Sequence, residues 1–274
     1  MAVYCPHRLT AMSESRPSHA FAVITGASRG IGAAYAEALA DRGYDLLLIG
    51  RDRLRLESVA SRLPRRGGEV FLETLDLAQP GATHRLYAMA RDRRPAVDLL
   101  INNAGFGLFG AMADMPLPRM QAMLQVHVTA VTESMRLFLP GMVERRSGAI
   151  INVSSVAGAY SLPYCAEYAA TKAYVIRLSE AVAEEVRPSG VLVQACCPAT
   201  TDTDFHATAG FRPTHGLGAQ TAQQVVAASL RALQRGRVVA PTGWRARGLM
   251  WLGRYGPGRV LLRAAARRMN PART

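Results

Sequence analysis

Short runs of apolar residues alternate with longer amphipathic stretches along most of this chain. The apolar runs cover residues 21–25, 45–49, 70–75, 98–102, 149–153, 191–197 and 238–240. Helical periodicity falls between them, near residues 30–42, 52–63, 81–93, 119–145, 167–187 and 222–235. Nearly continuous apolar strands that alternate with helices are typical of a parallel sheet covered on both faces. The pattern predicts an α/β fold with a doubly wound, seven-stranded parallel sheet.

These elements fit one domain, which spans roughly residues 20–241. A polar N-terminal extension, residues 1–19, precedes it and a basic C-terminal tail, residues 242–274, follows it. The extension lacks the apolar core of a signal peptide, and no apolar run approaches the roughly 18 residues of a membrane span. Four cysteines show neither disulfide-framework nor metal-ligand spacing: Cys5, Cys165, Cys196 and Cys197. We therefore expect a cytoplasmic chain with reduced thiols.

The positive charge is concentrated at the C-terminal end. The formal net charge is +13, no acidic residue follows Asp204, and twelve arginines do. Between residues 244 and 268, arginines are interleaved with tryptophan, leucine and valine, which is typical of helices that lie on anionic membrane surfaces. The alternatives are a tail that packs over the subunit and a surface for substrate access. Nucleic acid is not expected, since no recognition motif accompanies the charge.

A glycine-rich turn follows the first predicted strand and leads into a helix. It reads TGASRGIG from Thr25 to Gly32. Glycines at this position let the backbone approach a pyrophosphate held at the helix N-terminus. Such a sequence is often only a turn, but its place after the first strand favours dinucleotide binding. The expected contacts are Gly26, Ser28, Arg29, Gly30, Ile31 and Gly32.

The end of the second strand bears on which dinucleotide is bound. A carboxylate there would bind the ribose 2′-hydroxyl of NAD, but this strand runs into Gly50 and Arg51. Arg51, helped by Arg29, could instead form charge-assisted hydrogen bonds to a 2′-phosphate. The sequence favours NADP(H), the alternative being two surface arginines in an arginine-rich chain.

Tyr168 and Lys172 lie four residues apart in a predicted helix and so share one helix face. Lys172 is the only lysine in the chain, against 32 arginines. Two charges about 5 Å apart interact by roughly 3 kcal/mol at an effective dielectric near 20. This predicts that Lys172 lowers the pKa of the Tyr168 phenol and makes it a general acid or base. Ser155, at the end of the fifth strand, offers a hydroxyl for the substrate oxygen.

These motifs, in this order and spacing, resemble those of the short-chain dehydrogenase/reductases. The resemblance rests on TGASRGIG, the run from Asn102 to Gly105, Ser155, and Tyr168-x-x-x-Lys172, and it covers about residues 20–241. It implies a Rossmann-type fold, a nicotinamide cofactor, and hydride transfer between that cofactor and a carbonyl or alcohol carbon.

The resemblance also implies a role for each matched residue. Tyr168 passes the proton, Lys172 tunes Tyr168 and binds the nicotinamide ribose, and Ser155 orients the substrate oxygen. The remaining cofactor contacts it implies are Asp76 and Leu77 beside the adenine, Asn103, Ala104 and Gly105 on the adenosine side, and Pro198 and Thr203 near the nicotinamide.

Two positions depart from the family pattern. Pro198 is followed by Ala199 where the family has glycine, which narrows the backbone freedom there. His127 stands where the family has an asparagine of a water relay to the lysine. A neutral imidazole can accept a hydrogen bond from a bridging water, whereas a protonated one cannot. We expect either a relay histidine, with activity falling below about pH 6, or a purely structural one.

The sequence thus predicts an NADP-dependent oxidoreductase acting on the carbonyl or alcohol group of a small, apolar or lipid-like molecule. Residues 204–220 are expected to cover the substrate, and a homodimer or homotetramer is expected. No metal site is expected, because the histidines and cysteines lack ligand spacing. The alternatives are a catalytically impaired NADP-binding sensor or scaffold at a membrane surface, and an epimerase-type enzyme, for which the C-terminal part is too short.

Overall fold

A computed structural model of the chain describes residues 19–202 and 219–270. The described residues form one seven-stranded parallel sheet in the order β3-β2-β1-β4-β5-β6-β7. Its strands are β1 (Phe21–Thr25), β2 (Asp45–Gly50), β3 (Val70–Thr74), β4 (Leu99–Asn102), β5 (Ala149–Val153), β6 (Leu192–Pro198) and β7 (Val239–Thr242). The order reverses between β1 and β4, and ligands of doubly wound sheets bind outside the carboxyl ends of the strands at such a point. The predicted Rossmann-type fold is confirmed.

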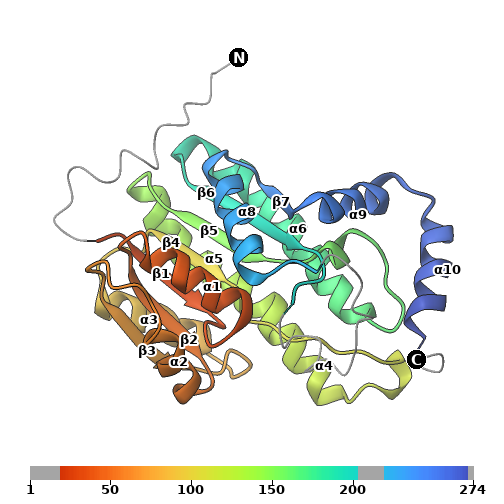
Figure 1. The fold of residues 1–274 in the computed structure, drawn as a ribbon, viewed down its shortest axis with the longest axis horizontal. Helices are drawn as coiled ribbons and strands as arrows, with labels where there is room; N and C mark the ends of the chain where they lie inside the picture. The colour runs from red at the N-terminus through yellow and green to blue at the C-terminus, as the bar shows by residue number, and fades with distance from the viewer. Residues whose placement is uncertain (1–18, 203–218, 271–274) are drawn as a thin grey trace.

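Helices cover both faces of this sheet (Figure 1). One face packs against α1 (Gly30–Ala40), α2 (Arg53–Ala60) and α8 (Ala222–Gln234), and the other against α3 (Ala82–Arg93), α5 (Ala130–Glu144) and α6 (Ala166–Val186). Within β1, Ala22 and Ile24 belong to the first core, whereas Phe21 and Val23 belong to the second. Successive side chains of a strand point to opposite faces, so a strand buried on both sides is apolar throughout.

The long helix predicted over residues 119–145 is interrupted. It comprises α4 (Leu117–Leu124), a π-helical segment η4 (Gln125–Thr129) and α5. A π-helical turn inserts extra backbone into a helix and re-aims the side chains on it. Here it carries His127, whose side chain is 1% exposed.

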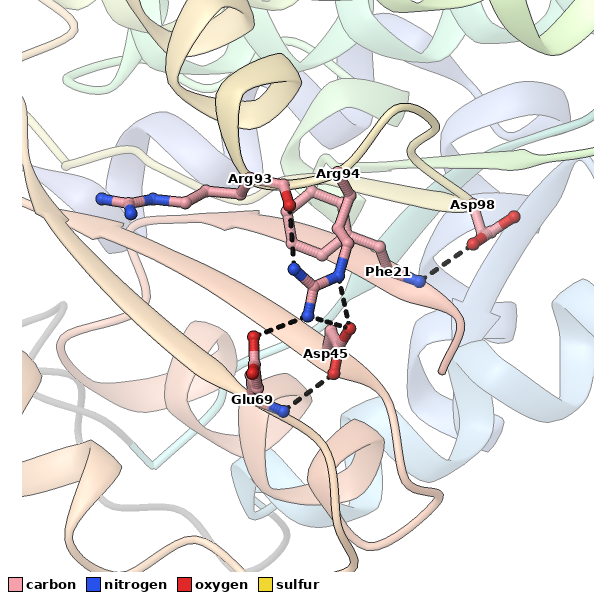
Figure 2. A network of polar contacts seen from close by, with 6 residues as sticks. All are labelled: Phe21, Asp45, Glu69, Arg93, Arg94 and Asp98. Carbon is pink, nitrogen blue, oxygen red and sulfur yellow. Dashed lines mark hydrogen bonds and ion pairs between the residues drawn. The ribbon is translucent and has the colours of Figure 1, made fainter. Parts of the chain in front are cut away.

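Polar contacts join the amino ends of β2 and β3, and those of β1 and β4 (Figure 2). Arg94 donates from Nε to Asp45 at 2.7 Å and from Nη2 to Glu69 at 2.6 Å. Asp45 also accepts the backbone N–H of Glu69 at 2.8 Å, and Asp98 accepts that of Phe21 at 2.9 Å. This network lies at the edge of the sheet opposite the carboxyl ends and holds the strand register there.

The tail forms two further helices, α9 (Trp244–Tyr255) and α10 (Gly258–Met269). α9 packs against β7 and against the short helix η5 (Val156–Ala159). Its Ala246 is fully buried and its Met250 packs beside Ala195 and Cys197 of β6. α10 lies at the edge of the molecule, away from the sheet (Figure 1), and none of its residues is buried.

Two glycines of α9 differ in how closely the helix backbone approaches neighbouring atoms. A Cβ on Gly253 would lie 2.7 Å from the Ala159 carbonyl oxygen, whereas a Cβ on Gly248 would meet nothing within 4 Å. Alanine improves the helix propensity at either position by roughly 0.5–1 kcal/mol. Gly248→Ala is therefore expected to stabilise α9. Gly253→Ala is expected to weaken its packing by about 1–3 kcal/mol, the usual range for overpacking.

Amide hydrogen exchange of α9 measures both effects, with Gly248→Ala as the matched control. Faster exchange along α9 in Gly253→Ala alone is the expected result. Equal protection in the two variants would mean that α9 does not depend on this close contact.

Candidate active site

A cleft of about 1760 Å³ lies at the carboxyl ends of the strands. Most of the predicted site residues line it: Gly26, Ser28, Arg29, Gly30, Ile31, Arg51, Asp76, Leu77, Asn103, Ala104, Gly105, Ser155, Tyr168, Lys172 and Pro198. Gly32 and His127 are not part of this lining, and Thr203 lies outside the described residues. Segments far apart in the sequence therefore meet in one cavity.

The glycine turn has the backbone that close approach to a ligand requires. Gly26 and Gly30 adopt φ values of +65° and +55°, which favour glycine. Gly32 lies beneath the turn, where an added Cβ would be 2.2 Å from the Gly26 carbonyl oxygen. Gly32 thus lets α1 start directly against the turn, and its contact with a ligand stays a prediction. Gly26 and Gly30 line the cleft with backbone alone, which fits the pyrophosphate of a dinucleotide.

Asn103 and Thr25 hold this turn from below. The Asn103 Nδ2 donates to the carbonyl oxygens of Thr25 at 2.9 Å and Gly26 at 3.0 Å. The Thr25 hydroxyl accepts the backbone N–H groups of Asn103 and Ala104, each at 3.0 Å. The sequence did not single out Thr25, because its partners directly follow β4 and are adjacent to it only in the folded sheet.

Two arginines line the cleft beside the glycine turn and the end of β2. Arg29 lines it from the glycine turn, and Arg51 lines it just after β2. Within the described residues, neither has a carboxylate partner at ion-pair distance. Asp76 lies nearby in the lining, and its Oδ1 accepts the Ala78 backbone N–H at 3.0 Å. Guanidinium groups available in a cleft suit a phosphate.

Ser155, Tyr168 and Lys172 come together where β5 and α6 meet. The Lys172 Nζ donates to the Val153 carbonyl at 2.9 Å and lies 5.6 Å from the centroid of the Tyr168 ring. A side-chain hydrogen bond joins Tyr168 and Ser155. Gly158 allows this packing, because a Cβ there would lie 2.6 Å from the Lys172 carbonyl carbon. The geometry suits a phenol that exchanges a proton with a substrate oxygen beside a cation.

The predicted lowering of the Tyr168 pKa is wrong for this structure. Desolvation raises the pKa of Tyr168 to about 12, although the hydrogen bond with Ser155 acts in the opposite direction. Burial also lowers the pKa of Lys172 from 10.5 to about 8. The cost of removing both groups from water outweighs the attraction between their charges here. Tyr168 is therefore a protonated acid at neutral pH.

His127 binds protein groups through both ring nitrogens. Its Nε2 accepts the Phe106 backbone N–H at 3.0 Å, and its Nδ1 lies 3.1 Å from the Thr171 hydroxyl. Because Nε2 accepts, Nδ1 carries the proton and donates to Thr171, which in turn donates to the Tyr168 carbonyl at 2.8 Å. With no nitrogen left to accept from water, the relay interpretation gives way to a structural one. His127 joins the loop after β4 to the helix that carries Tyr168.

The pKa of His127 bears on the expected loss of activity below about pH 6. Burial, assisted by the charge of Lys172, holds the pKa of His127 well below its ordinary value of 6.5. Any loss of activity that His127 causes is therefore expected at a lower pH than a solvated histidine would give. The expectation used the pKa of a solvated histidine, and the sequence alone could not show how deeply this one is buried.

Pro198 is the last residue of β6. It lines the cleft together with Ala199 and Thr201. Ala199 is not among the described residues with positive φ, so the chain accommodates alanine there without a left-handed backbone. The expected substrate cover, residues 204–220, lies almost wholly outside the described residues. Among the residues that the structure does describe, no group of three or more His, Cys, Asp or Glu side chains could hold a metal ion.

The C-terminal helices form the far wall of the same cleft. Leu249 and Leu252 of α9 line it, as do Leu261 and Met269 of α10. Three arginines are interspersed with this apolar lining: Arg119, Arg245 and Arg268. The part of the tail next to the body is thus a wall of the site.

Comparison with known proteins places the chain in a family. The profile of the short chain dehydrogenase family matches residues 20–211, and the chain belongs to this family. It is similar to a solved short-chain dehydrogenase from Sphingobium yanoikuyae in complex with NADPH. That match has 34% identity and a TM-score of 0.77, covering 84% of this chain and 90% of the other. A solved short chain dehydrogenase/reductase from Burkholderia phymatum, in complex with NAD, has 26% identity and a TM-score of 0.77, covering 87% and 94%.

Curated relatives match over a shorter stretch. The very-long-chain 3-oxoacyl-CoA reductase of Bos taurus is 34% identical over 184 residues, which cover 65% of this chain and 58% of the relative. The chain spans less than two thirds of the length of the first curated relatives that it matches. The fold and the family profile thus agree with each other.

Proposed function

We propose that this protein is an NADP(H)-dependent carbonyl reductase acting on an apolar or lipid-like substrate. The observation that carries the proposal is the convergence of Ser155, Tyr168 and Lys172 in one cleft with the glycine turn. The solved relative in complex with NADPH supports the choice of cofactor. An impaired sensor is the weaker reading, because this catalytic set is complete.

The bound nicotinamide would supply the hydride. Tyr168 donates its proton to the substrate oxygen as negative charge develops there, and its raised pKa keeps that proton in place at neutral pH. Ser155 holds the same oxygen through its hydroxyl. Lys172 stabilises the phenolate left on Tyr168 and holds the nicotinamide ribose. A phenol that stays protonated is in the form that reduction of a carbonyl requires.

The remaining cofactor contacts follow the cleft. The backbone from Gly26 to Ile31 would hold the pyrophosphate, Asp76 and Leu77 the adenine, and Ala104 and Gly105 the adenosine. Thr203, outside the described residues, stays a proposed contact near the nicotinamide.

Arg51 is expected to select NADPH over NADH. A hydrogen bond to a charged group contributes roughly 1.5–3 kcal/mol, or about ten- to a hundredfold in affinity. Arg51→Ala should therefore weaken NADPH binding by about that factor and leave NADH binding nearly unchanged. Fluorescence titration with each dinucleotide measures both affinities. Equal losses for the two dinucleotides would refute a contact with the 2′-phosphate, and Arg62→Ala, an exposed arginine elsewhere, serves as the control.

The substrate end of the cleft supports an apolar substrate. Leucines and a methionine of α9 and α10 face the cavity beside Phe106 and Phe109. The bovine relative acts on 3-oxoacyl-CoA by its name, and a long-chain ketone would suit these walls. Oxidation of NADPH with ketones of increasing chain length tests this. We expect KM to fall as the chain length increases. The proposed function would be overturned if the enzyme turned over none of the ketones, aldehydes or quinones tested.

Assembly and compartment are part of the same proposal. The exposed sides of α4, α5 and α6 are proposed to pair with a second copy in a homodimer or homotetramer. A cytoplasmic location fits the free cysteines Cys165, Cys196 and Cys197.

A further inference from the structure

The outer face of α9 carries a stripe of exposed aromatic side chains. Trp244, Trp251 and Tyr255 are 76%, 63% and 66% exposed, whereas Ala246 on the opposite side is fully buried. At 3.6 residues per turn these three aromatic positions fall within about 40° of one another around the helix. None of them lines the cleft. The stripe is therefore separate from the substrate wall.

Cations flank this aromatic stripe. The Arg254 guanidinium lies 5.7 Å from the Tyr255 ring centroid, and that of Arg245 lies 5.1 Å from Trp244. The Trp251 and Tyr255 rings are 6.0 Å apart. Exposed tryptophan and tyrosine beside arginine are typical of groups placed at the boundary between lipid headgroups and acyl chains.

α10 adds an arginine row on its exposed side. Arg259, Arg263 and Arg267 recur every four residues, so they follow one side of the helix, and all three are exposed. Val260 and Leu262 are also exposed, at 62% and 42%. A helix of twelve residues is marginal in water unless packing stabilises it, yet no residue of α10 is buried. The side of α10 that faces away from the cleft therefore needs a partner surface to stabilise the helix.

We propose that the outer faces of α9 and α10 dock onto an anionic phospholipid surface. Charge complementarity selects this partner, because no acidic residue follows Asp204 in the sequence while twelve arginines do. A second copy of the chain would place its own arginines against these arginines, and like charges repel. Aromatic and aliphatic side chains would enter the headgroup boundary while the arginines bind the lipid charges. Within the described residues no helix is both long and apolar enough to cross a bilayer.

Docking in this orientation would leave the inner faces of the two helices against the cleft. The outer faces hold the lipid, and the inner faces, through Leu252 and Leu261, line the cavity. The proposed lipid-binding surface and the cleft lie on the same two helices. The residues substituted in the experiments below do not line the cleft. The inference goes beyond the proposed function and does not depend on it.

Vesicle co-sedimentation of the full chain tests the proposal directly. The two probes are vesicles of phosphatidylcholine alone and vesicles that also contain about 30% of the anionic lipid phosphatidylglycerol. Binding is expected only to the anionic vesicles. Each arginine near the surface accounts for roughly a fivefold change in affinity, so Arg259→Gln/Arg263→Gln/Arg267→Gln should lose on the order of a hundredfold.

A matched control separates location from overall charge. Arg62→Gln/Arg65→Gln/Arg231→Gln removes the same number of exposed positive charges elsewhere and should bind almost as wild type. Trp251→Ser/Tyr255→Ser should weaken binding at least tenfold with all charges retained. Circular dichroism shows whether each variant is folded, and vesicle binding needs no turnover, so failure of the reductase proposal would be seen separately.

Three outcomes would overturn the inference. One is equal binding to neutral and anionic vesicles, and another is equal losses in the two arginine variants. The third is no binding to either kind of vesicle. Tight binding of duplex DNA, or self-association that Trp251→Ser/Tyr255→Ser abolishes, would then identify the partner as nucleic acid or a second copy.

Discussion

Tyr168→Phe is expected to reduce the turnover of NADPH by about 10²–10⁴-fold, the usual contribution of general acid–base catalysis. The variant lacks only the hydroxyl, so the ring keeps its packing beside Lys172 and His127. NADPH affinity should therefore change by less than about threefold, well under 1.4 kcal/mol. Steady-state kinetics and fluorescence titration of NADPH measure the two effects.

Tyr174→Phe is the matched control for this variant. Tyr174 lies on the same helix, its hydroxyl is 3.0 Å from the Thr132 hydroxyl, and it does not line the cleft. Loss of this hydroxyl should leave turnover unchanged. Activity of Tyr168→Phe within threefold of wild type would remove Tyr168 from the proton transfer.

Lys172→Met is expected to lose activity and gain stability at neutral pH. The amine lies 5.6 Å from the Tyr168 ring centroid, so its charge contributes about 3 kcal/mol to a phenolate, or about a hundredfold in rate. Lys172 is only 6% exposed. Burial lowers its pKa from 10.5 to about 8, which corresponds to about 3 kcal/mol of destabilisation. Loss of the hydrogen bond to Val153 offsets about 1 kcal/mol, leaving a gain of about 2 kcal/mol.

The pH dependence distinguishes this explanation from a packing effect. Below about pH 8, Lys172 is charged in both the folded and the unfolded chain. Between pH 8 and 10.5 the unfolded chain binds more protons, so wild-type stability rises with pH, whereas methionine does not titrate. The advantage of Lys172→Met should therefore shrink between pH 7 and pH 10 in urea denaturation. A constant difference would contradict the buried charge, and wild-type reduction should decline as the pH rises through about 8.

The central strands β1, β2, β4 and β5 could be predicted from the sequence because they are buried on both faces and therefore largely apolar. The break in the long helix could not, since a π-helical segment changes the backbone hydrogen bonds without leaving a clear mark on the hydrophobic pattern. That segment re-aims His127, and so the function of this residue was open until its two partners, Phe106 and Thr171, were known.

The candidate site shows the same division. Spacing alone placed Tyr168 above Lys172, because helix geometry is regular. Their pKa values depend on how much water the fold removes, which only the three-dimensional packing determines. The structural roles of Thr25 and Gly32 were likewise hidden, since each acts on a segment that the sheet brings next to it.

The separation between the two edges of the sheet has a consequence for protein engineering. The network around Arg94 joins the amino ends of the strands, and Tyr168 stands beyond the carboxyl ends. A strand of five residues such as β1 separates the two edges by roughly 16 Å. Substitutions farther apart than about 10 Å usually combine additively. The amino edge can thus be redesigned for heat resistance, by strengthening the contacts of Asp45 and Glu69, while the chemistry at the other edge is optimised separately.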